Sequence, residues 1–354
     1  MNKLIKAIAL ILIVGIGLCG CEKSDNTKKP NNESRNYSET LRVYNAADYI
    51  DRATIADFEK EFKIRVIYDE FESNEIMYEE IVDSPDSYDV LVPSDYMIDR
   101  LIKEGRLEKL NIGKIPNISN VAPLYLSPDY DPNNDYIVPY MVGTLGILYN
   151  KRLVKDPVDS WEALWDPKYK GEILMWDSMR DCLGAAMKML GFSMNTNDNA
   201  ELAKVKERLL AQRPLVKAYM EEDIRDIMIA DEATLALIYS GEAKTAIDQN
   251  PNLAYVIPKE GANKWVDGFV ILKNTKHLDA AEKFIDFMCR PNIAIRNMTE
   301  TGYTSPIPGA WAEFGENTIM FPTEEELDRC EAFLYNAEAI QKYDRLWYDV
   351  RGGH

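Results

Sequence analysis

Histidine is almost absent from this chain of 354 residues, which contains only His277 and His354. The patterns HExxH, GxSxG and the Walker A loop are absent as well. Histidine-based catalysis and histidine-rich metal sites are therefore not expected. His277 follows an expected strand in a Lys-rich turn, where a solvated loop residue is the simplest interpretation, and His354 ends the sequence. We expect no metal and no other cofactor.

Cysteine is also scarce, with five residues in total. Two of them, Cys19 and Cys21, lie near the start, and the others are Cys182, Cys289 and Cys330. The chain has no C-x-x-C pair and no Cys/His cluster. One disulfide among the last three is open on sequence alone, but buried free thiols are the simpler interpretation.

Basic residues are outnumbered, with 41 Lys and Arg against 59 Asp and Glu and a formal charge of −18. Binding phosphate groups needs a basic face, so this balance argues against nucleic acid and against an anionic membrane surface. It is compatible with a cationic ligand.

No uncharged run is long enough to span a bilayer, which needs roughly 20 residues. The run at 7–21 is shorter, follows Lys3 and Lys6, and ends in LCGC. It resembles the apolar part of a signal peptide with a lipobox. We therefore expect residues 1–20 to be a lipoprotein signal peptide and Cys21 to be lipidated. Residues 21–40 are then the lipidated cysteine and a polar, flexible tether.

The pattern after residue 40 alternates strands and helices. We expect strands at 41–47, 64–68 and 88–93, and helices at 51–63, 75–81 and 95–104. This βαβαβα order indicates a mainly parallel sheet covered by helices, whose ligands bind at the carboxyl ends of the strands. The turns that follow residues 44 and 93 therefore lie at a binding edge.

A second set of elements follows an extended, glycine-bearing segment at 140–148, which suits a hinge crossing. Further strands are expected at 173–176, 235–239, 254–257 and 268–272. Helices are expected at 179–190, 199–211, from 242, at 278–289, at 292–299 and at 323–348.

Seven short sequence motifs together suggest a family. They are ESNEIMY at 72–78, YDVLVPSDY at 88–96, DPNNDY at 131–136, SWEALW at 160–165, KYKG at 168–171, WVDG at 265–268 and GYTSP at 302–306. Each is weak alone, but in this order they resemble the spermidine/putrescine-binding protein of bacterial ABC polyamine importers. The likeness runs from about residue 41 to 350.

The resemblance implies an α/β fold of two lobes, the type II periplasmic-binding-protein fold, in which each lobe is a mixed sheet flanked by helices. Lobe 1 is expected at 41–143 plus 269–312, and lobe 2 at 144–268 plus 313–354. The ligand cleft lies at the hinge between the lobes.

The resemblance also implies the ligand-binding residues. A polyamine is a string of ammonium groups joined by methylenes, so its site needs carboxylates for the charges and aromatic rings for the spacers. The expected ligand-binding residues are Asp48, Tyr49, Ser94, Asp95, Tyr96, Asp181, Tyr239, Trp265, Asp267 and Tyr303. Tyr239 stands where the family usually has tryptophan, and Asp95 lies beside the matching positions.

Some positions depart from the family pattern. Ala46 and Ala47 stand where the family has a tryptophan and a hydroxyl residue, and Ser178 stands where it often has an aspartate. Phe333 falls near a usual glutamine. One ring and one carboxylate are therefore missing, and Asp95 is the nearest replacement acid.

Other interpretations of individual residues stay open at this point. Tyr96 and Tyr303 are also compatible with core packing, and Asp267 with a turn. Asp181 is compatible with a helix start that favours the dipole. Tyr78, Trp161 and Trp165 carry the resemblance but are expected to be packing residues.

The expected function is that of a lipid-anchored solute-binding protein which captures spermidine or putrescine for import and is not an enzyme. It is expected to be a monomer on the extracytoplasmic face of the bacterial cell membrane, periplasmic in a Gram-negative cell. Its partners are the polyamine and the permease subunits of an ABC transporter. Two alternatives remain: a binding protein for another small cationic or polar solute, and a secreted hydrolase with a carboxylate pair.

Overall fold

The computed structural model describes residues 37–221, 223–315 and 319–352. The expected signal peptide, Cys21 and most of the tether lie outside the described residues. The first strand begins at Glu39, two residues inside the segment expected to be tether.

The first group of elements, which we call the first lobe, contains a parallel three-stranded unit. β1 lies between β2 and β3, with Val43 paired to both Tyr68 and Val90. Asp51 caps α1 by accepting a hydrogen bond from the backbone N–H of Ala53 at 2.8 Å. The elements are β1 Glu39–Ala46, α1 Arg52–Phe62, β2 Ile64–Phe71, α2 Asn74–Asp83, β3 Val90–Leu91, α3 Asp95–Lys103, α8 Leu278–Met288, α9 Pro291–Thr301 and α10 Pro308–Trp311.

The second group, the second lobe, is built on β5, which pairs in parallel with both β6 and β7. Neither β6 nor α6 was expected, because the short segment of β6 is only partly buried and shows no clear alternation. The elements are β5 Ile173–Trp176, α4 Met179–Met189, α5 Asn199–Gln212, β6 Val216–Met220, α6 Asp223–Ile229, β7 Leu235–Tyr239, α7 Ser240–Gln249, β8 Leu253–Val256, α11 Glu324–Asp328 and α12 Ala337–Arg351.

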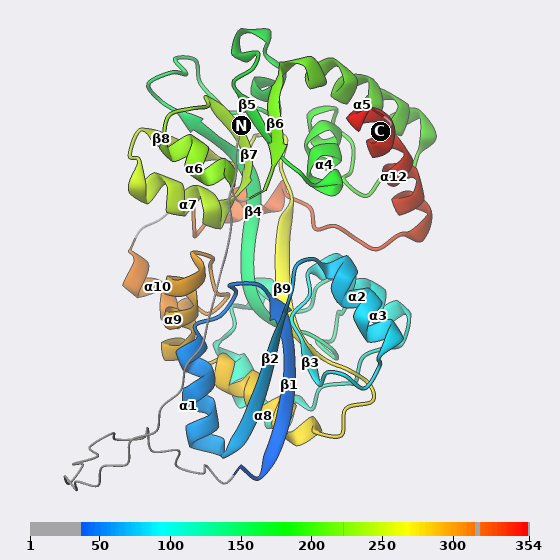
Figure 1. Ribbon diagram of the computed structural model, residues 1–354, viewed down its shortest axis with the longest axis vertical. Coiled ribbons are helices and arrows are strands. Elements are labelled where there is room, and N and C mark those ends of the chain that lie inside the picture. Colours follow the sequence, from blue (N-terminus) through cyan, green and yellow to red (C-terminus); the bar gives the residue numbers. More distant parts are fainter. Residues whose placement is uncertain (1–36, 222, 316–318, 353–354) are drawn as a thin grey trace, which may run out of the picture. The chain divides into compact units, whose positions relative to one another are not determined.

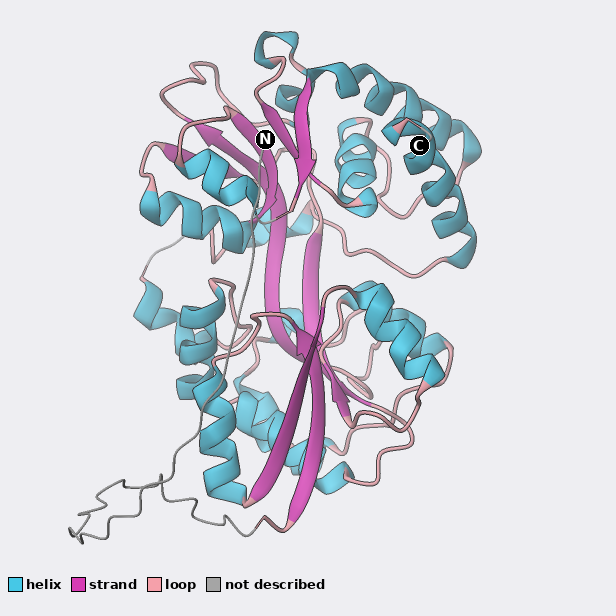
Figure 2. Cartoon of the chain, in the orientation of Figure 1, coloured by secondary structure: helices cyan, strands magenta, loops and turns pink. Residues whose placement is uncertain are grey.

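Two long antiparallel strands, β4 (Val138–Asn150) and β9 (Lys264–Ile271), join the lobes (Figure 1). β9 pairs with β3 at one end, and the far half of β4 pairs with β7 and β8. The strand order is β2-β1-β3-β9-β4-β7-β5-β6, with β8 beside β4, and helices flank the strands in both lobes (Figure 2). The expected crossing segment is therefore confirmed.

The two glycines of β4 have a more specific role than hinge flexibility. A Cβ atom on Gly143 would lie 2.3 Å from Cζ2 of Trp265, and one on Gly146 would lie 2.5 Å from the ring of Tyr255. Glycine is needed at both positions because aromatic side chains cross directly over the strand.

Each lobe has its own buried apolar clusters, in which Phe58 belongs to the first lobe and Trp161 to the second. Trp161 and Trp165 are buried, so their expected packing role is confirmed. Cys182, Cys289 and Cys330 are buried free thiols. Within the described ranges, no helix is both long and apolar enough to cross a membrane.

The expected continuous helix at 323–348 is wrong. Residues 329–336 separate α11 from α12, which begins after its N-cap Asn336. In this interval the backbone of Glu331 accepts from Lys264 and donates to Ala262, so it extends the β8–β9 connection. The Glu331 carboxylate binds Lys188 at 2.9 Å and the backbone N–H of Met194 at 3.0 Å. These tertiary contacts override a sequence with good local helix propensity.

Candidate ligand-binding cleft

A cavity of about 640 Å³ lies where the carboxyl ends of β1, β3, β5 and β7 meet the crossing strand β9. Strand ends of this kind are the usual ligand edge of an α/β sheet. All ten side chains named from the sequence line this cavity. The fold thus brings the ten together, while their part in binding stays a prediction.

Asp267 lies at the centre of one wall, within β9 and opposite Met141 of β4, so it does not form a turn. Tyr49 donates its phenolic hydrogen to Oδ2 of Asp267 at 2.8 Å. The other carboxylate oxygen, Oδ1, is buried and has no hydrogen-bond partner in the part of the chain that the structure describes. Burial raises the pKa of Asp267 to about 6, against the opposing effect of the neighbouring hydroxyl groups of Ser94 and Tyr49.

Aromatic rings surround this carboxylate. The ring centroids of Trp265 and Tyr303 are 5.2 Å apart, and those of Tyr49 and Tyr303 are 5.8 Å apart, both in edge-to-face contact. Tyr303 lies against Gly241, where a Cβ would come within 2.4 Å of its ring. These rings offer apolar faces that suit methylene groups or an ammonium.

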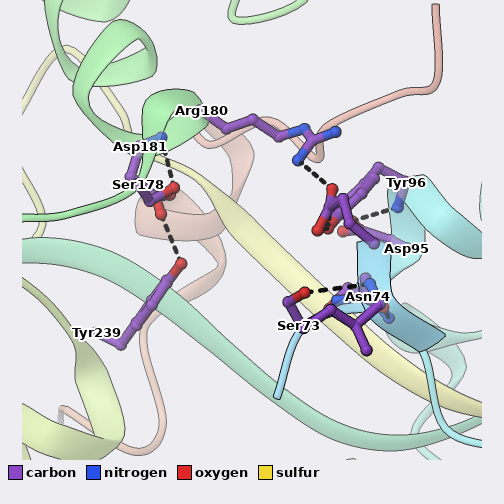
Figure 3. A network of polar contacts seen from close by, with 11 residues as sticks. Ser73, Asn74, Asp95, Tyr96, Ser178, Arg180, Asp181 and Tyr239 are labelled. Carbon is purple, nitrogen blue, oxygen red and sulfur yellow. Dashed lines mark hydrogen bonds and ion pairs between the residues drawn. The ribbon is translucent and has the colours of Figure 1, made fainter. Parts of the chain in front are cut away.

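The second lobe contributes Asp181 in the first turn of α4. Its Oδ2 accepts a hydrogen bond from the hydroxyl of Tyr239, the last residue of β7, at 2.5 Å (Figure 3). The whole residue is 2% exposed, and burial raises the pKa of its carboxyl group. A residue that only favoured the helix dipole would not need this burial or this partner, so the position also suits a ligand.

The third wall follows β3. Ser94 is fixed by Asn74, whose amide accepts from the backbone N–H at 3.0 Å and donates to the hydroxyl at 3.1 Å. Asp95 is buried, and its oxygens accept from the backbone N–H groups of Tyr96 at 2.7 Å and Val266 at 3.4 Å. Its carboxylate lines the cavity but already binds the backbone of β9, which makes it a weaker replacement acid than the sequence suggested.

Asp48 occupies the turn after β1 with a φ of 52°, in the left-handed region that aspartate tolerates better than most residues. Its backbone N–H donates to Oε1 of Glu70 at 3.2 Å, and its side chain is exposed at the edge of the cavity. Burial raises the pKa of the neighbouring Tyr49 well above its usual range, so this phenol remains a donor at neutral pH.

The departures from the family pattern also line the cavity: Ala46, Ala47, Ser178 and Phe333. Ser178 is the N-cap of α4, because its hydroxyl accepts from the backbone N–H of Asp181 at 3.4 Å. A small alanine at position 46 and a short serine at position 178 leave space where a ring and a carboxylate were expected.

Sequence reasoning missed several lining residues: Asn74, Trp176, Arg180, Arg225, Asn263, Glu242, Glu300 and Thr301. Arg225 binds Glu242 at 3.0 Å across the start of α7. A site for cations gives no reason to expect arginines in its wall, and the position of Arg180 beside Asp181 was the one available signal in the sequence. Within the described ranges, no group of His, Cys, Asp and Glu could hold a metal ion.

A model of the bacterial extracellular solute-binding protein family matches residues 53–322, which is more than half of the sequence. The chain belongs to this family. The solute-binding protein is 37% identical over 321 residues to the spermidine/putrescine-binding periplasmic protein of Escherichia coli, which covers 89% of this chain and 92% of the relative. It is 34% identical over 347 residues to the protein of the same name from Salmonella typhimurium, which covers 96% of both.

Solved structures agree with this assignment. The solute-binding protein superposes with a TM-score of 0.82 and 37% identity on a putative spermidine/putrescine ABC transporter protein from Listeria monocytogenes, over 89% of this chain and 99% of that chain. It superposes with a TM-score of 0.81 and 34% identity on a spermidine/putrescine ABC transporter substrate-binding protein from Streptococcus pneumoniae, over 89% of this chain and 99% of that chain. The expected two-lobe periplasmic-binding-protein fold is therefore confirmed. The named relatives are binding proteins of transporters, which opposes the hydrolase alternative.

Proposed function

We propose that this solute-binding protein captures polyamines of the spermidine and putrescine class and delivers them to an ABC permease, without catalysing a reaction. The observation that carries the proposal is the Asp267 carboxylate, whose Oδ1 is buried without a partner among the described residues, beside the rings of Tyr49 and Trp265. An unpaired buried acceptor is costly, and a ligand ammonium would supply the missing hydrogen bond and charge.

The second lobe offers the complementary group for the other end of such a ligand. Asp181 is buried beside Tyr239 and Trp176, whose ring centroids are 5.0 Å apart. Carboxylates on two walls with rings between them suit a chain that carries positive charge at both ends. The names of the relatives from Escherichia coli and Salmonella typhimurium support the same ligand class.

The charge of the residues that line the cavity also fits a cationic ligand. Among the residues that the structure describes, the cavity wall contains six acidic side chains and two arginines. The acids are Asp48, Asp95, Asp181, Glu242, Asp267 and Glu300, and the arginines are Arg180 and Arg225. An excess of acid favours a cationic solute and attracts it at long range.

Anchoring and assembly are part of the same proposal. The sequence LCGC at 18–21 supports lipidation of Cys21 after removal of residues 1–20. The tether then holds a monomeric binding protein on the extracytoplasmic face of the cell membrane, near its permease. The lobe boundaries proposed from the family are 41–143 plus 269–312 and 144–268 plus 313–354. Asp267 falls just outside the first of these lobes, on the crossing strand β9, where it contacts Tyr49 of the first lobe.

A thermal-shift panel tests the proposal. A ligand that binds only the folded protein adds RT ln(1 + [L]/Kd), or about 2.7 kcal/mol at a hundredfold excess over Kd. Putrescine, cadaverine, spermidine and spermine are expected to raise the melting temperature, and neutral amino acids and sugars are not. A shift with a sugar or an amino acid, and none with the amines, would identify a different solute and refute the polyamine proposal.

A further inference from the structure

Arg180 reaches across the cleft from the second lobe to the first. It lies in the first turn of α4, and its Nη1 binds Oε1 of Glu75, on α2, at 3.0 Å. Its guanidinium carbon lies 3.8 Å from the centroid of the Tyr96 ring. The Tyr96 hydroxyl donates to the same Glu75 carboxylate at 3.2 Å, so the three side chains form one closed group. Figure 3 shows Arg180 extending from α4 toward Tyr96.

This group places a fixed cation in the wall of a cavity proposed for cations. The Arg180 side chain is 19% exposed and lines the cavity, whereas Glu75 is 53% exposed and does not. Asp181 follows Arg180 directly in the chain, and Asp95 precedes Tyr96. A guanidinium released from Glu75 would have these two carboxylates within its surroundings, and pairing with either would compete with a ligand ammonium.

A second contact links the lobes through the same helix, α3, that carries Tyr96. The backbone N–H of Tyr335 donates to Asp99 at 2.9 Å, and Lys103 donates to the backbone carbonyl of Tyr335 at 3.0 Å. Asn195 ties the segment before Tyr335 to the second lobe through Leu334, whose N–H it accepts at 2.8 Å. Protein groups of both lobes therefore make the contact on this side of the cleft.

We propose that Glu75 is a positioning residue for ligand retention. It holds Arg180 on the Tyr96 ring, which links the two walls and directs the guanidinium to Glu75 instead of into a hydrogen bond with a carboxylate assigned to the ligand. This inference rests on the proposed polyamine function and deepens it. Because Glu75 does not line the cavity, its loss is expected to speed the dissociation of every polyamine by a similar factor and to leave their ranking unchanged.

Stopped-flow tryptophan fluorescence with putrescine and with spermidine tests this, since Trp176 and Trp265 line the cavity. The variants are Glu75→Gln, Arg180→Gln and the double change, and the matched control is Glu79→Gln. Glu79 is exposed on the same helix, and its replacement removes the same charge. Partly exposed ion pairs contribute up to about 1 kcal/mol, so Glu75→Gln is expected to raise the dissociation rate about two- to fivefold over the control.

The double change decides whether the effect acts through Arg180. In the Arg180→Gln background, Glu75→Gln is expected to have no further effect on dissociation. Equal dissociation rates for Glu75→Gln and Glu79→Gln would overturn the inference, and so would an effect that persists without Arg180 or a change confined to the association rate. If the unmodified protein responds to neither polyamine, the proposed function fails and this inference falls with it, which is a distinct result.

Discussion

Tyr49 and Asp267, 218 positions apart in the chain, meet at 2.8 Å and together define the wall on which the proposed function depends. The phenol occupies one carboxylate oxygen and leaves the other, buried and unpartnered among the described residues, for a ligand. Tyr49 is itself held in place, because its backbone carbonyl accepts hydrogen bonds from the Asn45 amide and the Tyr140 hydroxyl. These contacts keep the arrangement rigid. The wall is thus organised before a ligand arrives, which lowers the cost of binding.

This geometry predicts that polyamine affinity depends on pH. With a pKa of about 6 in the ligand-free protein, Asp267 is largely protonated at pH 5 and ionised at pH 7. An ammonium binds the ionised form, so affinity is expected to rise with pH up to about 6 and then level off, with a loss of about tenfold at pH 5 relative to pH 7. Titrations at pH 5, 6 and 7 measure this change.

The control for this prediction is the proton balance. Binding at pH 5 is expected to release a proton, because the ligand lowers the pKa of Asp267, and this release appears as a buffer-dependent heat. Equal affinities at pH 5 and 7, with no proton released, would show that Asp267 does not pair with the ligand.

A second prediction concerns Gly143. An alanine there would place Cβ 2.3 Å from the Trp265 ring and 2.9 Å from Oγ of Ser240. The ring has to move, and overpacking of this kind costs about 1–3 kcal/mol. Gly143→Ala is therefore expected to lower the melting temperature and to weaken polyamine binding.

Gly309→Ala is the matched control for this substitution. Gly309 lies in α10, away from the cavity, and its nearest Cβ contact would be 3.2 Å from Pro291. The control is expected to bind like the unmodified protein. If Gly143→Ala also binds with unchanged affinity, then the position of Trp265 does not matter for the ligand.

Much of this fold could be predicted from the sequence, because local patterns are strong where neighbouring residues decide the structure. The helix after Asp51 and the strands around β4 are examples. The interval at 329–336 was missed because the contacts that break the helix come from Lys188, Met194 and Lys264, which are far away in the chain.

The same distinction applies to the cleft. Asp267 and Trp265 could be identified because both lie in one short sequence motif, WVDG, that resembles a known family. Arg180 could not be identified, since its role depends on Glu75, which lies in the other lobe and 105 positions earlier in the chain, and on the ring of Tyr96. Asp95 likewise accepts a hydrogen bond from the backbone N–H of Val266 in β9, and no local sequence pattern predicts this contact.

The departures from the family give a third prediction. Ala46→Trp with Ser178→Asp places a ring and a carboxylate at the cavity wall, and aspartate is a good N-cap, so α4 should keep its start. The double change is expected to raise the affinity for spermidine relative to putrescine, because a third amine gains a partner. Competition titrations give this ratio, and an unchanged ratio would show that these two positions do not set ligand length.

A fourth prediction concerns the amino terminus, outside the described residues. We expect the protein isolated from its native membrane to begin at Cys21 and to carry covalently bound lipid. Stable anchoring needs more than one acyl chain, so the mass should exceed that of a single modification. Mass spectrometry of the native terminus decides this, and a retained Met1 or an unmodified Cys21 would contradict it.

The most direct test of the central claim is calorimetric titration of the unmodified protein and of Asp267→Asn with spermidine and putrescine at pH 7. The amide keeps the shape and loses the charge, so affinity is expected to fall more than tenfold, or by about 1.4 kcal/mol. The ligand-free variant should melt on the order of 1–3 °C higher, because a buried charge is gone, and this shows that it is folded. Unchanged affinity in a folded Asp267→Asn protein would contradict the account.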